Sequence, residues 1–349
     1  MLKRLSQHER LVLLIAEFEP KFREAFFAVI AEIKSSITLR VLVERLERND
    51  ILGAVDALQI EPEAFARVEV AIAEAYNGGG MAMAESLLLR DPQGHRIAFR
   101  FGVRNPEAEA WLRTHSAALV THIVEDQRDG IRQALAEGLA QGNNPRVTAL
   151  GVVGRINRVS GKREGGIIGL TSPQERFVAA ARAELLSGDP AQLRNYLTRE
   201  RRDKRFDGAV RRAISSEKPV GGQTVVRMVG RYADRLLALR GELLARTETM
   251  FALGQSRDDA MRQAIRAGKV SADLVTKHWR SAGDSRVRHT HRVLNGNSVG
   301  FYEAFQSPSG VQLRFPGDPQ APISETSGCR CSVEYKVDYA GQLLRRLAA

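Results

Sequence analysis

The sequence predicts an α+β protein, with a mostly α-helical body followed by a small, loop-rich α+β module at its C-terminal end. Up to residue 268, apolar residues recur among charged ones at the three- and four-residue spacing of amphipathic helices. After residue 283, short apolar pieces alternate with turn-forming segments such as NGN and PGDPQAP, which is typical of short strands. Helices that precede strands along the chain favour an α+β arrangement.

The first of three predicted regions, residues 1–104, is helical. LVLLIAEFEPKFREAFFAVIAEIK and TLRVLVERLERNDILGAVDAL both place apolar residues at helical spacing. The run NGGG at 77–80 predicts a break in the helical pattern, and IAFRFGVRNP after it predicts an extended connector.

The second region, residues 105–222, begins with a long amphipathic helix. Pro106 suits the first turn of this helix, and QGNNP ends it. The following segment, GVVGRINRVSGKREGGIIGLTS, is rich in glycine and basic residues. It does not match a phosphate-binding loop, because Arg163 follows Lys162 where the loop requires Ser or Thr. We therefore predict a flexible connector, after which helices resume.

The third region, residues 223–349, joins the helical body to the C-terminal module. Its helical pattern predicts a long helix and then a second helix that ends at Gly268. The pieces SVGFYEAF, VQLRF and CSVEYKVDY, separated by turns, predict the strands of the module.

The charge of the chain is unevenly distributed. The net charge is +11, and residues 151–349 hold 34 Lys and Arg against 20 Asp and Glu, a net of +14. This excess indicates contact with a polyanion such as double-stranded DNA, bound without sequence preference. No apolar run reaches the roughly 18 residues that span a bilayer, so we expect no membrane contact and synthesis in the cytoplasm.

One basic run is the candidate nucleic-acid contact. Seven basic residues lie between Arg199 and Arg212 against three acidic ones, and a solvated helix face is the alternative interpretation. The DNA-binding candidates in this run are Arg199, Arg201, Arg202, Lys204 and Arg205.

Cys329 and Cys331 are the only cysteines of the chain. On a strand, residues two apart lie about 6.5–7 Å apart, at the limit for a disulfide, and the cytoplasm is reducing. A zinc set with His289 and His291 is an alternative, although the His-x-His and Cys-x-Cys spacings are tighter than usual for structural zinc. We expect no metal or other cofactor, and two small thiols that are buried or half-buried in the closing strand.

Catalytic motifs are missing from the sequence. It contains no G-x-S-x-G turn, no H-E-x-x-H helix and no dinucleotide fingerprint. Asp284, His289, His291 and Glu248 are the residue types of a nuclease acid–base pair, but such a cluster in an arginine-rich turn favours a structural role. We therefore predict that the protein is not an enzyme.

Four motifs, RTET, DSRVRHTH, PGDP and CRC, follow one another in the C-terminal half. In this order and spacing they resemble the phage Mu F-like minor head protein family, also called phage head morphogenesis proteins. Upstream, GRINRVSGKREGGIIGLTSPQERF and RERRDKRFD are similar to the form found in Mu-like prophages, so the resemblance covers at least residues 150–340. Some relatives have a C-x-x-C pair after the aspartate that looks like part of a zinc set, and this chain has DSRVRHTH there.

The resemblance implies a virion protein that acts in head assembly, DNA packaging or ejection. Such proteins associate with the portal protein inside the head, beside the major capsid or scaffolding protein, after synthesis in the host cytoplasm. The alternative is a nuclease or ADP-ribosyltransferase-like effector carried in the head, because the family's module is sometimes fused to toxin domains. Only ten residues follow CRCSVEYKVDY, which is too few for a fused catalytic domain.

The motif residues are expected to hold the module together. RTET is expected at the end of a long helix, with Glu248 bound to Arg286 or Arg288 by charge-assisted hydrogen bonds. Arg246 is expected to bind Asp284 or a backbone carbonyl of the turn. The alternative places both helix residues in solvent. The predicted structural set is Arg246, Glu248, Asp284, Arg286, Arg288, His291, Cys329 and Cys331.

Overall fold

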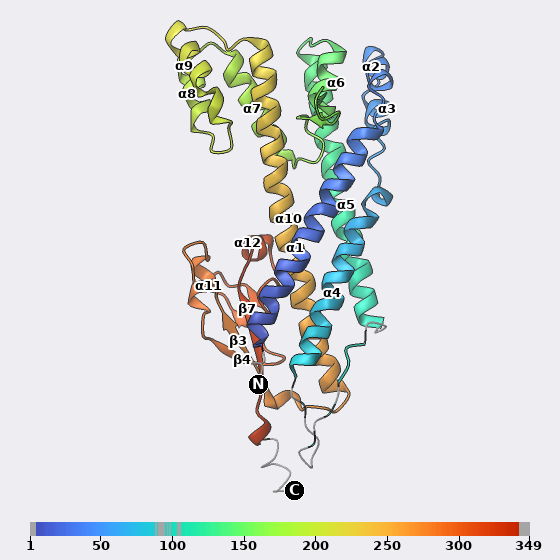
Figure 1. The fold of residues 1–349 in the computed structure, drawn as a ribbon, viewed down its shortest axis with the longest axis vertical. Coiled ribbons are helices and arrows are strands. Elements are labelled where there is room, and N and C mark those ends of the chain that lie inside the picture. The colour runs from blue at the N-terminus through green and yellow to red at the C-terminus, as the bar shows by residue number, and fades with distance from the viewer. Residues whose placement is uncertain are drawn as a thin grey trace. The chain divides into compact units, whose positions relative to one another are not determined.

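The computed structural model describes residues 5–87, 89, 95, 97, 99–102 and 106–341 (Figure 1). The described chain is mostly helical and carries a small three-stranded sheet near its C-terminal end, so the predicted α+β class is confirmed. None of its described helices is long and apolar enough to cross a membrane.

The contacts between residues divide the chain into two compact units. The sheet unit comprises residues 1–25, 68–116 and 243–349, and the hairpin unit comprises residues 26–67 and 117–242. Each unit is therefore built from segments that lie far apart in the sequence.

The predicted regions 1–104, 105–222 and 223–349 do not coincide with these units. Periodicity along the chain shows where a helix lies, but it does not show which segments pack against it. Three long helices contribute residues to both units: α1 (Gln7–Ser36), α5 (Pro106–Ala140) and α10 (Gly222–Arg266).

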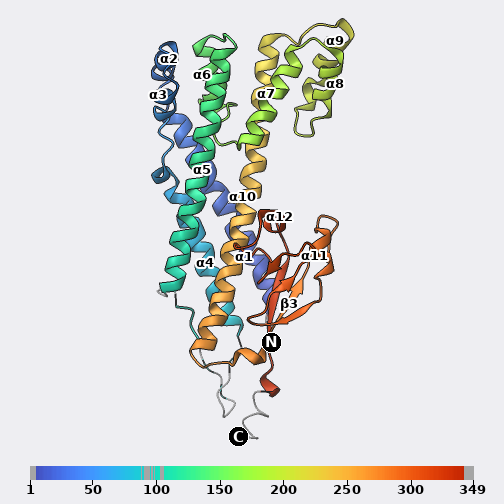
Figure 2. The same ribbon diagram turned by 180° about the vertical axis from the view of Figure 1, so that it is seen from behind.

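The sheet unit contains a three-stranded antiparallel sheet in the order β4-β3-β7. Lys277 of the central strand pairs with Val299 on one side and with Tyr335 on the other. Figure 2 shows β3 and α11 of this unit from behind. Its further elements are most of α4 (Ala66–Ser86), η3 (Ala272–Leu274), β3 (Val275–Arg280), α11 (His289–Val293), β4 (Ser298–Gly300), β5 (Phe305–Gln306), β6 (Gln312–Leu313), α12 (Ile323–Thr326) and β7 (Ser332–Val337).

The predicted break at NGGG is wrong, because these residues lie inside α4. A Cβ atom on Gly79 would lie 3.2 Å from the Cα atom of Leu253, and one on Gly78 would lie 2.6 Å from the ring of Phe18. The glycines therefore allow α4 to pack closely against α1 and α10 within the sheet unit.

The predicted pair of helices after residue 222 is a single helix, α10, although its end near Gly268 is as predicted. Gly254 does not interrupt it. A Cβ atom there would lie 2.9 Å from the ring of Phe315, so this glycine provides room for a neighbouring ring.

The hairpin unit contains the C-terminal parts of α1 and α5 and the N-terminal part of α10. Its predicted flexible connector contains a two-stranded antiparallel hairpin, in which Arg155 pairs with Glu164. Thr171 and Gln174 then form a capping box at the start of α7. The further elements are α2 (Leu39–Glu47), α3 (Ile51–Asp56), η1 (Pro62–Phe65), α6 (Pro145–Val153), β1 (Arg155–Ile156), β2 (Arg163–Glu164), α7 (Ser172–Leu186), α8 (Pro190–Thr198), η2 (Lys204–Phe206) and α9 (Asp207–Ser216).

Candidate functional site

Thr247, in the middle of RTET, connects α10 to the segment that precedes CRC. Its hydroxyl oxygen accepts a hydrogen bond from the backbone N–H of Gly328 at 2.9 Å and donates one to the carbonyl of Leu243 at 2.8 Å. The motif lies well inside α10 and not at its end. The sequence does not reveal this contact, because a threonine in a helix carries no signal of a distant partner.

The predicted bond from Glu248 to Arg286 or Arg288 is wrong. The Glu248 carboxylate lies 2.7 Å from Nε2 of His115 and is almost completely buried. Arg288 donates instead to the carbonyl of Ser327. Helix periodicity does not reveal the histidine on α5 that lies opposite the carboxylate.

The predicted bond from Arg246 to Asp284 is also wrong. Arg246 forms two hydrogen bonds with Glu19 of α1, at 2.8 and 3.2 Å. Asp284 instead accepts hydrogen bonds from both terminal nitrogens of Arg330, one of them at 2.6 Å, and from the backbone N–H of Arg286 at 3.0 Å. The bond from Arg330 is the main reason that the pKa of Asp284 is lowered. This pair joins DSRVRHTH to CRC.

The two thiols and one imidazole meet in the interior of the sheet unit. His291, Cys329 and Cys331 are 1%, 2% and 2% exposed, and both cysteines are free thiols. Nδ1 of His291 lies 3.5 Å from Sγ of Cys329 and 3.6 Å from Sγ of Cys331. His289 lies on the exposed side of α11 and does not join them. The structure thus brings together three of the four residues of the alternative zinc set.

A buried carboxylate lies behind the imidazole. Oε2 of Glu325 is 3.0 Å from Nε2 of His291, the ring nitrogen that faces away from the sulfur atoms. The carboxylate is held in place by the hydroxyl groups of Thr290 at 3.0 Å and Ser309 at 2.5 Å. Glu325 lies in α12, four residues before Cys329, and was not among the residues predicted from the sequence.

The two thiols differ in acidity. The pKa of Cys331 is lowered because the Cys329 thiol, His291 and the backbone N–H of Ala282 donate hydrogen bonds to its sulfur. The pKa of Cys329 is raised because its thiol donates to Cys331 and because it is buried. The pair therefore favours one thiolate and one thiol, and the thiolate is the form that binds metals.

Arg199 and Arg202, two of the predicted DNA contacts, take part in ion pairs within the hairpin unit. Arg199 holds the buried carboxylate of Glu184 with two hydrogen bonds of 2.8 Å. Arg202 holds Asp207 with two of 2.9 Å. Their side chains are only 14% and 15% exposed, so these two arginines stabilise the packing of α7, α8 and α9.

The remaining three candidates are more accessible. Arg205 binds the buried carboxylate of Asp203 at 2.7 Å, but its side chain stays 68% exposed. Arg201 and Lys204 are exposed, and no ion pair is found for either within the described chain. The basic run is therefore part structural and part solvated.

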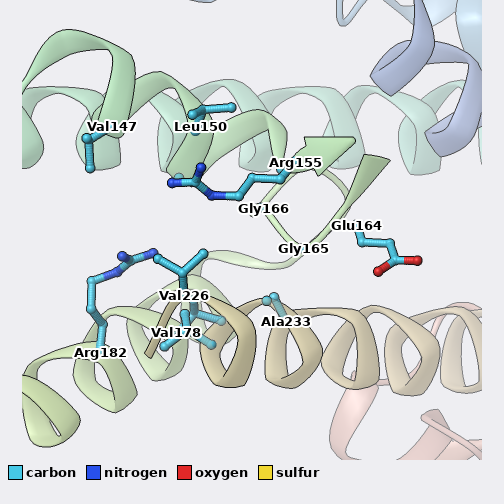
Figure 3. Close-up of a pocket in the computed structure, with 14 residues that line it drawn as sticks. Val147, Leu150, Arg155, Glu164, Gly165, Gly166, Val178, Arg182, Val226 and Ala233 are labelled. Carbon is cyan, nitrogen blue, oxygen red and sulfur yellow. The ribbon is translucent and has the colours of Figure 1, made fainter. Parts of the chain in front are cut away.

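Two further arginines converge on a small surface pocket in the hairpin unit (Figure 3). The side chains of Arg155 and Arg182 extend toward each other from opposite walls, whereas Glu164 points away from them. Burial, and then the charge of Arg155, lower the pKa of Arg182. No acidic partner of either arginine is found in the described residues, so the pocket suits an anionic group.

No protein-family model matches the chain, and neither a curated protein nor a solved structure with significant similarity was found.

Proposed function

We propose that the protein is a minor head protein of a phage or prophage, which binds the portal protein and the packaged DNA and has no catalytic role. The observation that supports this most is the convergence of RTET, DSRVRHTH, PGDP and CRC, the motifs that resemble the Mu F-like family. They are separated along the chain, yet all four form contacts within the sheet unit.

Three of the motifs are joined at CRC and the residue beside it. The Thr247–Gly328 hydrogen bond joins RTET to the segment beside CRC. The Asp284–Arg330 pair joins DSRVRHTH to CRC, and His291 adds a second connection through Cys329. Residues that are widely spaced in the sequence therefore define one folded module.

PGDP is joined to α10 through an arginine. Asp318 binds the guanidinium of Arg314, which donates a second hydrogen bond to Gln255 of α10 at 3.1 Å. The carboxylates of Glu248, Asp284 and Asp318 are thus all bound by partners within the protein. Such groups are not free to bind and convert a substrate, which supports an assembly role over a catalytic one.

The DNA contact is assigned to exposed cations of the hairpin unit. Arg201 and Lys204 remain exposed in the basic run, and Arg158 and Lys162 are exposed on the β1–β2 hairpin. Contacts between such cations and phosphates release counterions and do not depend on the base sequence.

The proposal is tested by the composition of purified particles and by capture of the portal protein encoded at the same locus. We expect the chain in DNA-filled heads, and we expect immobilised full-length protein to retain the portal protein. A surface variant, Glu242→Ala, serves as the matched control. Absence from particles together with failure to retain the portal protein would refute the assignment.

A second experiment tests the DNA contact and the enzyme alternative together. Binding to a mixed-sequence duplex should weaken steeply between about 50 and 200 mM salt, because counterions are released on binding. The double variant Arg201→Gln, Lys204→Gln should reduce affinity equally on unrelated sequences. Supercoiled plasmid incubated with Mg²⁺ should remain uncut, and nicking that follows the protein through purification would favour the nuclease alternative.

A further inference from the structure

We infer that His291, Cys329 and Cys331 bind one zinc ion, which clamps α11 to the CRC segment. This inference does not depend on the role of the protein in a phage head. It replaces the expectation that the two cysteines are metal-free structural thiols.

The separations of the three donor atoms fit tetrahedral zinc. Zinc lies about 2.3 Å from a cysteine sulfur and about 2.0–2.1 Å from a histidine nitrogen, so a tetrahedral site places sulfur and nitrogen about 3.6 Å apart. The observed distances from Nδ1 of His291 are 3.5 Å to Cys329 and 3.6 Å to Cys331. All three donor atoms lie within 4.8 Å of one another, so one ion reaches all of them without rearrangement of the backbone.

Glu325 provides the second shell that a zinc-bound histidine requires. A histidine that binds zinc through one ring nitrogen generally donates the N–H of the other to a carboxylate or carbonyl. Nε2 of His291 lies 3.0 Å from Oε2 of Glu325, and within the described chain it has no partner with full hydrogen-bond geometry. The hydroxyls of Thr290 and Ser309 fix the carboxylate on this side of the ring.

The donor types select the metal and its role. Two sulfur atoms and one imidazole favour zinc over magnesium or calcium, which prefer oxygen ligands. The three ligands also line a small pocket, together with Arg286, Arg288 and Gly328, which has room for one water molecule as a fourth ligand. The ligands come from a short helix and from a segment without regular structure, and neither is long enough to hold its position by itself. A structural zinc contributes directly to the folding of such a module.

The experiment begins with the full-length protein, purified under reducing conditions without chelator. Elemental analysis should find one zinc per chain. Replacement of zinc by Co²⁺ should produce thiolate-to-cobalt charge-transfer absorption and the visible bands of a tetrahedral site. Two free thiols with no stoichiometric metal, even after reconstitution with Zn²⁺, would overturn the inference.

Matched variants locate the ligands. Cys331→Ser and His291→Gln should abolish stoichiometric binding, whereas His289→Gln, two residues away and exposed, should bind as the wild type does. Glu325→Gln should retain the metal with an affinity about 10–100-fold lower, measured by competition with a chromogenic chelator. Equal zinc content in His291→Gln and His289→Gln would also overturn the inference. If a ligand variant fails to fold, the cobalt spectrum of the wild type still decides between the two outcomes.

Discussion

The buried carboxylate of Glu248 on α10 lies 2.7 Å from Nε2 of His115 on α5, and this pair connects the two helices inside the sheet unit. Trp111 stacks on the histidine ring, with centroids 4.6 Å apart, and fixes its orientation. A residue that belongs to a C-terminal motif is thus held by a partner from the first third of the chain.

Replacing Glu248 with Ala should lower the free energy of unfolding by about 3–5 kcal/mol, the usual cost of removing one partner of a buried pair. His115→Ala should have a similar effect, and the double variant should cost less than the sum of the two. Chemical denaturation provides the measurement. Glu242→Ala, at an exposed position of the same helix, is the control and should change stability by less than about 0.5 kcal/mol.

The two threonines of RTET should respond differently to replacement by valine. Thr247→Val removes the acceptor of the Gly328 N–H and should cost about 1–3 kcal/mol. Oγ1 of Thr249 is buried and has no hydrogen-bond partner among the described residues, so Thr249→Val should be neutral or stabilising. Valine has the same shape as threonine, so the difference in melting temperature between the two variants reports the contribution of the hydrogen bond alone. Equal melting temperatures would contradict the assigned role of Thr247.

Arg199 and Arg201 should separate stability from DNA binding. Arg199→Ala leaves the buried carboxylate of Glu184 unpaired and should cost about 3–5 kcal/mol. Arg201→Ala should leave stability within about 0.5 kcal/mol of the wild type and weaken binding to duplex DNA. Denaturation and binding titrations on the same samples test both expectations. Stability losses of similar size in the two variants would show that Arg201 is also structural.

The stability of the protein should depend on the protonation of Glu175. Burial, and then the charge of Asp126, raise the pKa of this carboxyl from 4.5 to about 8. The folded state therefore binds more protons than the unfolded state between these two pH values. The free energy of unfolding should fall as the pH rises from about 4.5 to about 8, by at most about 5 kcal/mol from this group.

Glu175→Gln should remove this part of the pH dependence and stabilise the protein at pH 8. Glu125→Gln, at an exposed position of α5, should leave the dependence unchanged. Denaturation midpoints across this pH range provide the measurement. The same slope in Glu175→Gln and in the wild type would show that another group is responsible.

The sequence by itself determined most of the secondary structure and the position of the C-terminal module. Amphipathic spacing located the helices of the body, and the end of α10 near Gly268 follows from the same pattern. Hydrophobic periodicity is a local property of the sequence, so it locates a helix whichever segments that helix packs against. The turns after residue 283 likewise marked the strands that lie among them, whereas the central strand β3 precedes residue 283 and was not predicted.

Only the tertiary structure decided which side chains meet. The run NGGG is typical of a break between helices, but α4 continues through it. The glycines leave the space that a Cβ atom would fill to neighbouring helices and rings. Three charged residues bind partners that sequence spacing does not reveal. Arg246 and Arg199 bind carboxylates, and Glu248 binds an imidazole. Cys329, Cys331 and His291 form one cluster, and Glu325 lies behind it, because the fold brings α11, α12 and CRC together. The energy of a charge pair or a metal site depends on distances of a few ångströms between segments that are far apart in the sequence, and packing sets those distances.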